Sequence, residues 1–130
     1  MKKKPIVIIT GGSSGLGRCL AAEFLGMHKP ICLISRKEDS LNKTRIELEK
    51  VYPDSEIMIM SGTVADESFV DGVYERLDAE DYYPEYLINC AGIGEFGKAE
   101  MISKKMIDSV FEGNLIGLML MCGKALKYMI

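Results

Sequence analysis

The chain has 130 residues, of which 48% are hydrophobic, and a formal net charge of −3 at pH 7. This length predicts one domain over residues 1–130, with enough apolar side chains for a core. The acidic balance excludes a basic face for nucleic acid, because we expect the one basic run, Lys2–Lys4, to be a solvated tail.

The cysteines and the longest apolar stretch indicate the cellular compartment that we expect. The four cysteines form no Cys-x-x-Cys pair, and His28 is the only histidine. We therefore expect reduced thiols in the cytoplasm, with no disulfide framework, metal site or Ser-His-Asp triad. The apolar stretch Leu115–Cys122 is shorter than the roughly 20 residues that span a bilayer, so we expect no membrane partner.

The first half of the chain alternates strand and helix patterns. Short runs rich in β-branched residues are typical of buried parallel strands, and mixed apolar and charged segments are typical of amphipathic helices. The pattern predicts a strand at Ile6–Thr10, a helix at Gly15–Met27, a strand at Ile31–Ser35, a helix from Asp39 or Ser40 to about Val51, and a strand at Glu56–Ser61.

The second half continues the alternation. We predict a helix at Asp66–Leu77, a turn at Tyr82–Glu85 around Pro84, a strand at Tyr86–Asn89, a glycine-rich loop, and a long helix from about Ser103 toward the end. Four strands separated by helices indicate an α/β fold: the first half of a Rossmann-like, doubly wound parallel sheet with helices on both faces. Right-handed crossovers then predict strand order 3-2-1-4, with a ligand crevice between strands 1 and 4.

The segment Thr10-Gly11-Gly12-Ser13-Ser14-Gly15-Leu16-Gly17 joins the first strand to the first helix. Glycine lets the backbone approach a ligand closely, and the first amides of a helix have no partner within it, so such a turn favours a phosphate. The alternative is a tight connection between strand and helix with nothing bound.

Three ordered motifs resemble the classical subgroup of the short-chain dehydrogenase/reductase family. The turn above is similar to the family's T-G-x-x-x-G-x-G. Asn89-Cys90-Ala91-Gly92 resembles its N-N-A-G segment after the fourth strand, and Gly113-Asn114-Leu115-Ile116-Gly117 resembles its V-N-x-x-G helix. The Asn89–Gly92 loop speaks against a third option, a flavodoxin-like or methyltransferase-type sheet.

The resemblance implies a set of cofactor-binding positions. The pyrophosphate and adjacent ribose would lie against Gly11, Ser13, Ser14, Gly15, Leu16 and Gly17, and the riboses against Cys90, Ala91 and Gly92. Thr63 and Val64 would lie beside the adenine, where family members usually have Asp-Val. Cys90 replaces the usual asparagine, which matters little for a main-chain contact.

Residues at the end of the second strand indicate which cofactor binds. An acidic residue there would accept from a free ribose 2′-hydroxyl and repel a 2′-phosphate. This chain has Ser35-Arg36-Lys37 instead, and arginine offers phosphate a planar fork of donors. We therefore favour NADP(H) over NAD(H); the alternative is that Arg36 and Lys37 form a solvated loop.

Asn114 interrupts an apolar stripe that recurs every four residues through Ile102, Met106, Val110 and Leu118. Alone, this pattern favours a buried amide that bonds backbone at a helix kink. The resemblance implies a catalytic position instead, in which the asparagine bends its helix and holds a water of the proton relay.

The family's proton donor, a tyrosine followed four residues later by lysine, has no counterpart in this chain, and neither does its substrate-orienting serine. The chain thus resembles the amino-terminal half of a reductase, truncated before the catalytic half and inactive alone. The expected function is that of an NADP(H)-dependent oxidoreductase interconverting a small-molecule carbonyl and a secondary alcohol. The alternative is a non-catalytic nucleotide-binding or interaction module. The exposed edge strand and apolar final helix predict a homo-oligomer.

Overall fold

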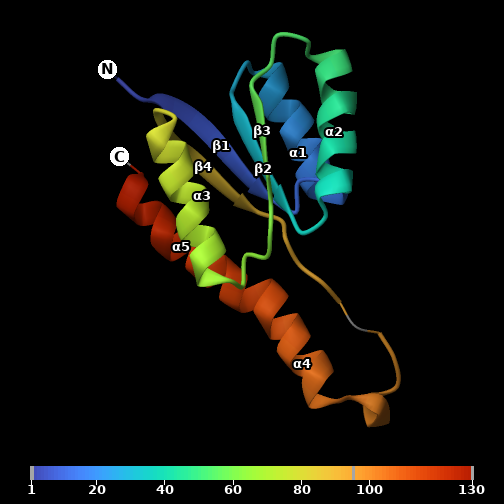
Figure 1. Cartoon of the computed structure of the whole chain (residues 1–130). Helices are drawn as coiled ribbons and strands as arrows, with labels where there is room; N and C mark the ends of the chain where they lie inside the picture. The colour runs from blue at the N-terminus through green and yellow to red at the C-terminus, as the bar shows by residue number, and fades with distance from the viewer. Residues whose placement is uncertain (1, 95, 130) are drawn as a thin grey trace.

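The computed structural model describes residues 2–94 and 96–129. Its centre is a parallel sheet of β1 (Lys4–Thr10), β2 (Ile31–Ser35), β3 (Ile57–Ser61) and β4 (Tyr82–Asn89). The strand order is β3-β2-β1-β4, which confirms the predicted topology (Figure 1).

The two central strands are buried on both faces, as their continuous apolar sequences require. Successive side chains point to opposite faces, so Ile6 and Ile8 of β1 enter one hydrophobic cluster while Val7 and Ile9 enter the other. The side chains of Val7, Ile8 and Ile9 are fully inaccessible to solvent. The sheet is therefore the shared wall of two cores.

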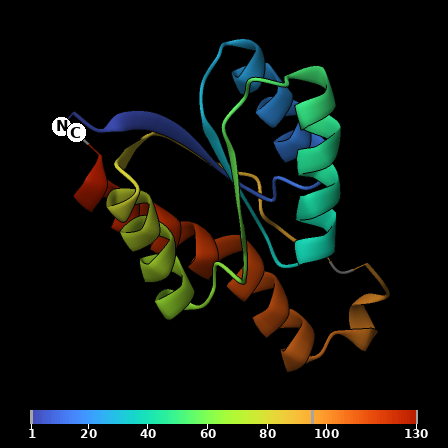
Figure 2. The same ribbon diagram turned by 45° about the horizontal axis from the view of Figure 1, so that its top comes forward.

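Helices cover each face of the sheet. α1 (Gly15–Gly26) and α2 (Glu38–Val51) pack on one face, and α3 (Glu67–Ala79) and α5 (Gly117–Tyr128) pack on the other (Figures 1 and 2). α2 begins at Glu38, slightly before the predicted cap, and Lys37 precedes it without a side-chain capping bond. This arrangement confirms the predicted layers.

The last helix is continuous but irregular. After the 3-10 turn η1 (Ala99–Met101), α4 (Lys104–Phe111) leads through the π-helical segment η2 (Glu112–Ile116) into α5. α4 projects beyond the sheet, whereas α5 lies along it (Figure 1). The joined helix, Lys104–Tyr128, is long and apolar enough to cross a membrane by length and composition alone. The expectation of no membrane partner was based on Leu115–Cys122, which is only part of this joined helix.

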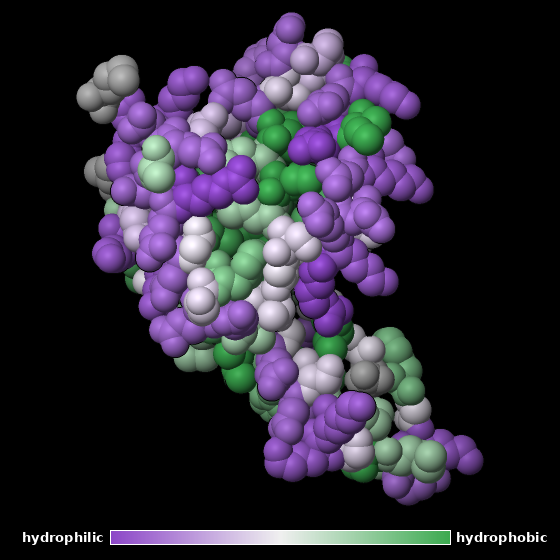
Figure 3. Space-filling view, viewed as in Figure 1, coloured by the Kyte–Doolittle hydropathy of each residue, from purple (hydrophilic) through white to green (hydrophobic). Residues whose placement is uncertain are grey.

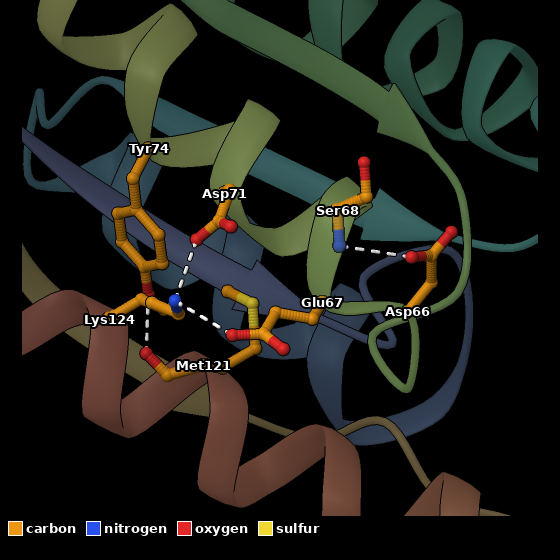
Figure 4. Close-up of polar contacts among 7 residues, drawn as sticks. All are labelled: Asp66, Glu67, Ser68, Asp71, Tyr74, Met121 and Lys124. Carbon is orange, nitrogen blue, oxygen red and sulfur yellow. Dashed lines mark hydrogen bonds and ion pairs between the residues drawn. The ribbon is translucent and has the colours of Figure 1, made fainter.

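Polar contacts attach α5 to α3 (Figure 4). The buried Tyr74 hydroxyl donates to the carbonyl oxygen of Met121 at 2.8 Å. The Lys124 ammonium lies 3.0 Å from carboxylate oxygens of both Glu67 and Asp71. These contacts attach α5, which continues the helix that carries Asn114, to α3.

The predicted turn around Pro84 is wrong, because this segment belongs to β4. Pro84 pairs with Ile6, and a bulge then leaves Glu85 without a partner in the ladder. β4 is an edge strand, where a residue without an N–H is tolerated. The Glu85 carboxylate instead accepts from the Lys29 ammonium at 2.8 Å.

Candidate functional site

A cleft of about 480 Å³ opens at the carboxyl ends of β1, β2, β3 and β4. Segments from four separate connections line it, which is where ligands bind in open parallel sheets. It brings together all the predicted cofactor-binding positions: Gly11, Ser13, Ser14, Gly15, Leu16, Gly17, Ser35, Arg36, Thr63, Val64, Cys90, Ala91 and Gly92.

The glycine-rich turn is compact because two of its glycines contact other backbone closely. Gly11 has a φ of +65°, and a Cβ there would lie 2.7 Å from the carbonyl oxygen of Cys90. A Cβ on Gly17 would lie 2.2 Å from the carbonyl oxygen of Gly11. Both positions therefore exclude larger residues, and the turn lies directly against the loop that follows β4.

The amino terminus of α1 faces the cleft with its donors free of side-chain caps. Ser14 occupies the N-cap position in an extended conformation, and its side chain makes no capping hydrogen bond. Gly15 has a φ of +54°, and no atom lies within 4 Å of where its Cβ would stand. Because the first amides of a helix lack partners within it, this terminus suits an anion.

Thr10 holds the loop that follows β4, which also lines the cleft. This residue is buried, its carbonyl oxygen accepts from the Cys90 amide at 3.2 Å, and its Oγ1 accepts from the Ala91 amide at 3.1 Å. The contact at Cys90 is made by main chain, and burial raises the pKa of the Cys90 thiol. Sequence reasoning did not single out Thr10, although it opens the glycine motif.

Arg36 stands at the end of the cleft beside β2. Its side chain is exposed and joins no ion pair of the described residues, while its carbonyl oxygen accepts from the Ser61 hydroxyl at 3.1 Å. Ser35 and Ser13 share a hydrogen bond between their hydroxyls, also 3.1 Å long. The backbone of Arg36 is therefore held, and its guanidinium is available to a ligand.

The segment Thr63–Val64, predicted to lie beside the adenine, is flanked by close packing at Gly62 and at Gly117. Val64 is buried, and a Cβ on Gly117 would lie 2.3 Å from its Cγ2 atom. A Cβ on Gly62 would lie at the same distance from the Phe69 ring. Thr63 is exposed, and its hydroxyl accepts from the Ala65 amide at 3.3 Å within its own turn.

Asn114 lies in the π-helical segment, next to the cleft lining. Its Oδ1 accepts from the Ile93 amide at 2.6 Å, and its Nδ2 donates to the Ile93 carbonyl at 2.8 Å. The alternative of a buried amide is wrong, because this residue is exposed, while the catalytic position of Asn114 stays a prediction. Its backbone-bonding role is present, and it connects the helix to the loop after β4.

Other lining residues were not predicted. Ile34, Gly62, Ala65, Asn89 and Ile93 directly adjoin predicted positions, whereas Ser109, Glu112 and Gly113 come from a separate part of the chain. These last three belong to the end of α4 and the start of η2, and only the position of this helix brings them to the cleft. Their proximity to Asn114 in the sequence was the available signal. Arg36 and Glu112 are the charged residues of the lining. Within residues 2–94 and 96–129, no group of acidic, cysteine or histidine side chains could hold a metal ion.

Comparison with known proteins establishes the family. The model of the short chain dehydrogenase family matches residues 5–130. The chain belongs to this family. The solved structure of a short chain dehydrogenase from Bacillus anthracis superposes with a TM-score of 0.89 at 27% identity, over 97% of this chain and 50% of that one.

Curated relatives of this chain include two reductases. The 3-ketodihydrosphingosine reductase of Bos taurus is 32% identical over 114 residues, or 85% of this chain and 34% of its own length. The levodione reductase of Leifsonia aquatica is 30% identical over 129 residues, or 95% of this chain and 47% of its own length. The chain thus spans less than half the length of either relative.

Proposed function

We propose that this short-chain dehydrogenase chain is the cofactor-binding half of an NADP(H)-dependent oxidoreductase that interconverts a carbonyl and a secondary alcohol. The observation that carries the proposal is the composition of the cleft. An uncapped helix terminus, a glycine turn with a positive φ at Gly11 and Gly15, and an available guanidinium converge there. These groups suit the diphosphate and the 2′-phosphate of one dinucleotide.

The residues present fit such a cofactor. A side chain at Gly15 would project into open space beside the helix terminus, so glycine leaves that space to a ligand. The loop at Cys90–Gly92 presents its backbone to the cleft, and hydrogen bonds from the Cys90 and Ala91 amides to Thr10 hold this loop in place. When bound, a nicotinamide cofactor supplies or accepts the hydride. This chain's residues would bind and orient it.

The relatives support the reaction class. Both curated proteins named above are reductases, and their matched regions cover most of this chain. The substrate would be a small-molecule carbonyl or alcohol. The family's tyrosine and lysine pair has no match among the six tyrosines of this chain.

The second candidate is a nucleotide-binding or interaction module without catalysis. A positioned general acid is worth about 10²–10⁴-fold in rate, so we expect residues 1–130 alone to bind NADPH without appreciable carbonyl reduction. NADPH oxidation is followed at 340 nm with a panel of ketones and aldehydes. Substrate-dependent oxidation by the purified chain would contradict this expectation and favour the enzyme.

The cofactor preference is tested by replacing Arg36. We expect the wild-type chain to bind NADPH more tightly than NADH, and Arg36→Asp to weaken NADPH by about tenfold or more while sparing NADH, because the carboxylate repels the 2′-phosphate. Calorimetric titration of both cofactors gives the ratio. Lys37→Asp is the matched control, since Lys37 is adjacent but does not line the cleft. An unchanged ratio in Arg36→Asp would overturn the preference.

A further inference from the structure

Thr44 is a buried polar residue on a helix that does not line the cleft. The residue is 2% exposed, and among the polar and charged residues other than tyrosine that the structure describes, only Thr10 is buried to that degree. Leu41 and Leu48, on the same helix, are buried in the core. A buried hydroxyl is destabilising unless it has a hydrogen-bond partner, so the partner of Thr44 identifies what the hydroxyl does.

That partner belongs to the glycine-rich turn. The Thr44 Oγ1 donates to the carbonyl oxygen of Ser13 at 3.2 Å, across 31 positions of sequence. The peptide bond that follows Ser13 is trans, so its C=O and N–H point in opposite directions. Because Thr44 binds the carbonyl, the N–H of Ser14 points away from α2. Ser14 lines the cleft and is the N-cap of α1.

A second contact connects α2 with the same region. Glu47, one helical turn after Thr44, forms an ion pair with Arg18 in the first turns of α1. The hydroxyl of Ser13 is in turn bonded to that of Ser35, so the turn is held from β2 as well as from α2. Together these contacts favour one orientation of the Ser13–Ser14 peptide. In the reversed orientation, a carbonyl oxygen would stand where an anion needs an N–H donor.

We propose that Thr44 is a positioning residue for diphosphate binding, which orients the Ser13–Ser14 peptide from behind without touching the ligand. This inference rests on the proposed function, because it presumes that a diphosphate binds at the turn. It extends the binding site to α2. This helix contributes no residue to the cleft lining, but its Thr44 makes a hydrogen bond to the backbone of the glycine-rich turn.

The test compares two substitutions and two ligands. Thr44→Val removes the hydroxyl with nearly the same shape, and Thr44→Ser keeps it. Binding of ADP, which carries the diphosphate, and of adenosine, which lacks it, is measured by NMR titration of the 130-residue chain. We expect Thr44→Val to weaken ADP by about three- to tenfold, the factor that corresponds to one net hydrogen bond, and to leave adenosine unchanged. Thr44→Ser should bind both ligands like the wild type.

Ile6→Val is the control for stability, because it removes one buried methylene at the other end of β1 and should leave ADP affinity unchanged. If Thr44→Val does not fold, Thr44→Cys, a weaker donor, provides the same comparison. Wild-type affinity for ADP in the variant, or equal losses for ADP and adenosine, would overturn the inference. A wild-type chain that binds no ADP, NADPH or NADH would overturn the proposed function as well, which separates the two failures.

Discussion

Gly17 and Gly72 are both helical glycines, but an added methyl group meets different surroundings at each. At Gly17 it would lie 2.2 Å from the carbonyl oxygen of Gly11, whereas at Gly72 it would have no atom within 4 Å. The first glycine is required by the close contact between α1 and its own turn. The second has no such requirement in the structure.

We therefore expect opposite effects on the free energy of unfolding. Gly17→Ala should destabilise the chain by about 1–3 kcal/mol through overpacking. Gly72→Ala should stabilise it by about 0.4–1 kcal/mol, because alanine restricts the unfolded chain and favours helix. Urea unfolding followed by circular dichroism measures both. Equal changes in the free energy of unfolding in the two variants would show that the close contact at Gly17 does not affect stability.

The contacts of Asn114 allow a second prediction at the scale of single residues. Its amide makes two hydrogen bonds to the backbone of Ile93, in the loop that carries one wall of the cleft. Asn114→Ala should increase hydrogen exchange at the Ile93 amide by about tenfold, because its acceptor is lost. The amide of Ile8, in the central strand, serves as the internal control. Unchanged exchange at Ile93 would mean that Asn114 does not order this loop.

At the scale of elements, one carboxylate joins the beginnings of three strands. Glu56 lies just before β3, and it accepts hydrogen bonds from Tyr82 at the start of β4 and from Lys4 at the start of β1. The Tyr82 bond, followed by the effects of Lys4, lowers the pKa of Glu56 despite its partial burial. Burial, followed by the bond to Glu56, raises the pKa of Tyr82 to about 12.

The direction of the Glu56 shift gives a pH prediction. A carboxyl whose pKa is lower in the folded state stabilises the fold above its unfolded pKa of about 4.3, and this contribution is lost as pH falls through the folded value. Tyr82→Phe should therefore reduce stability at pH 7 and have a much smaller effect near pH 3. Urea midpoints at both pH values measure the difference. An equal loss at both pH values would assign the effect to packing instead.

At the scale of the whole molecule, the main asymmetry is an apolar surface along the last helix. Exposed hydrophobic side chains continue from α4 through η2 into α5: Ile107, Phe111, Leu115, Ile116, Leu118 and Met119. The space-filling view shows apolar atoms interleaved with polar ones on the projecting segment (Figure 3). Surfaces of this kind recruit partners.

We expect the 130-residue chain to self-associate through this surface. Met119→Glu should shift sedimentation at micromolar concentration toward the monomer, because it places a charge within the apolar surface. Val51→Glu is the matched control, since Val51 is also exposed but ends α2 on the opposite face of the sheet. A clean monomer for the wild-type chain, or equal effects of both variants, would contradict the expectation.

Local pattern was enough to predict most of the fold. The apolar runs at residues 6–10 and 31–35 identified the central strands, because a strand buried on both faces cannot be polar at alternate positions. Strand order followed from the handedness of crossovers, and the cleft residues followed from their motifs at strand ends. Pro84 was misread because the same residue suits a turn or an edge strand, and only the sheet shows that β4 is an edge.

By itself, the sequence determined β1, β2, β3 and the glycine turn, because each depends on neighbours within a few residues, and three ordered motifs indicated the family. Only the tertiary structure decided that Thr44 bonds Ser13, that Asn114 bonds Ile93 while exposed, and that Ser109 and Glu112 reach the cleft. These pairings join segments far apart in the chain. They depend on where each helix packs against the sheet, and that position results from all the side chains of the two cores together.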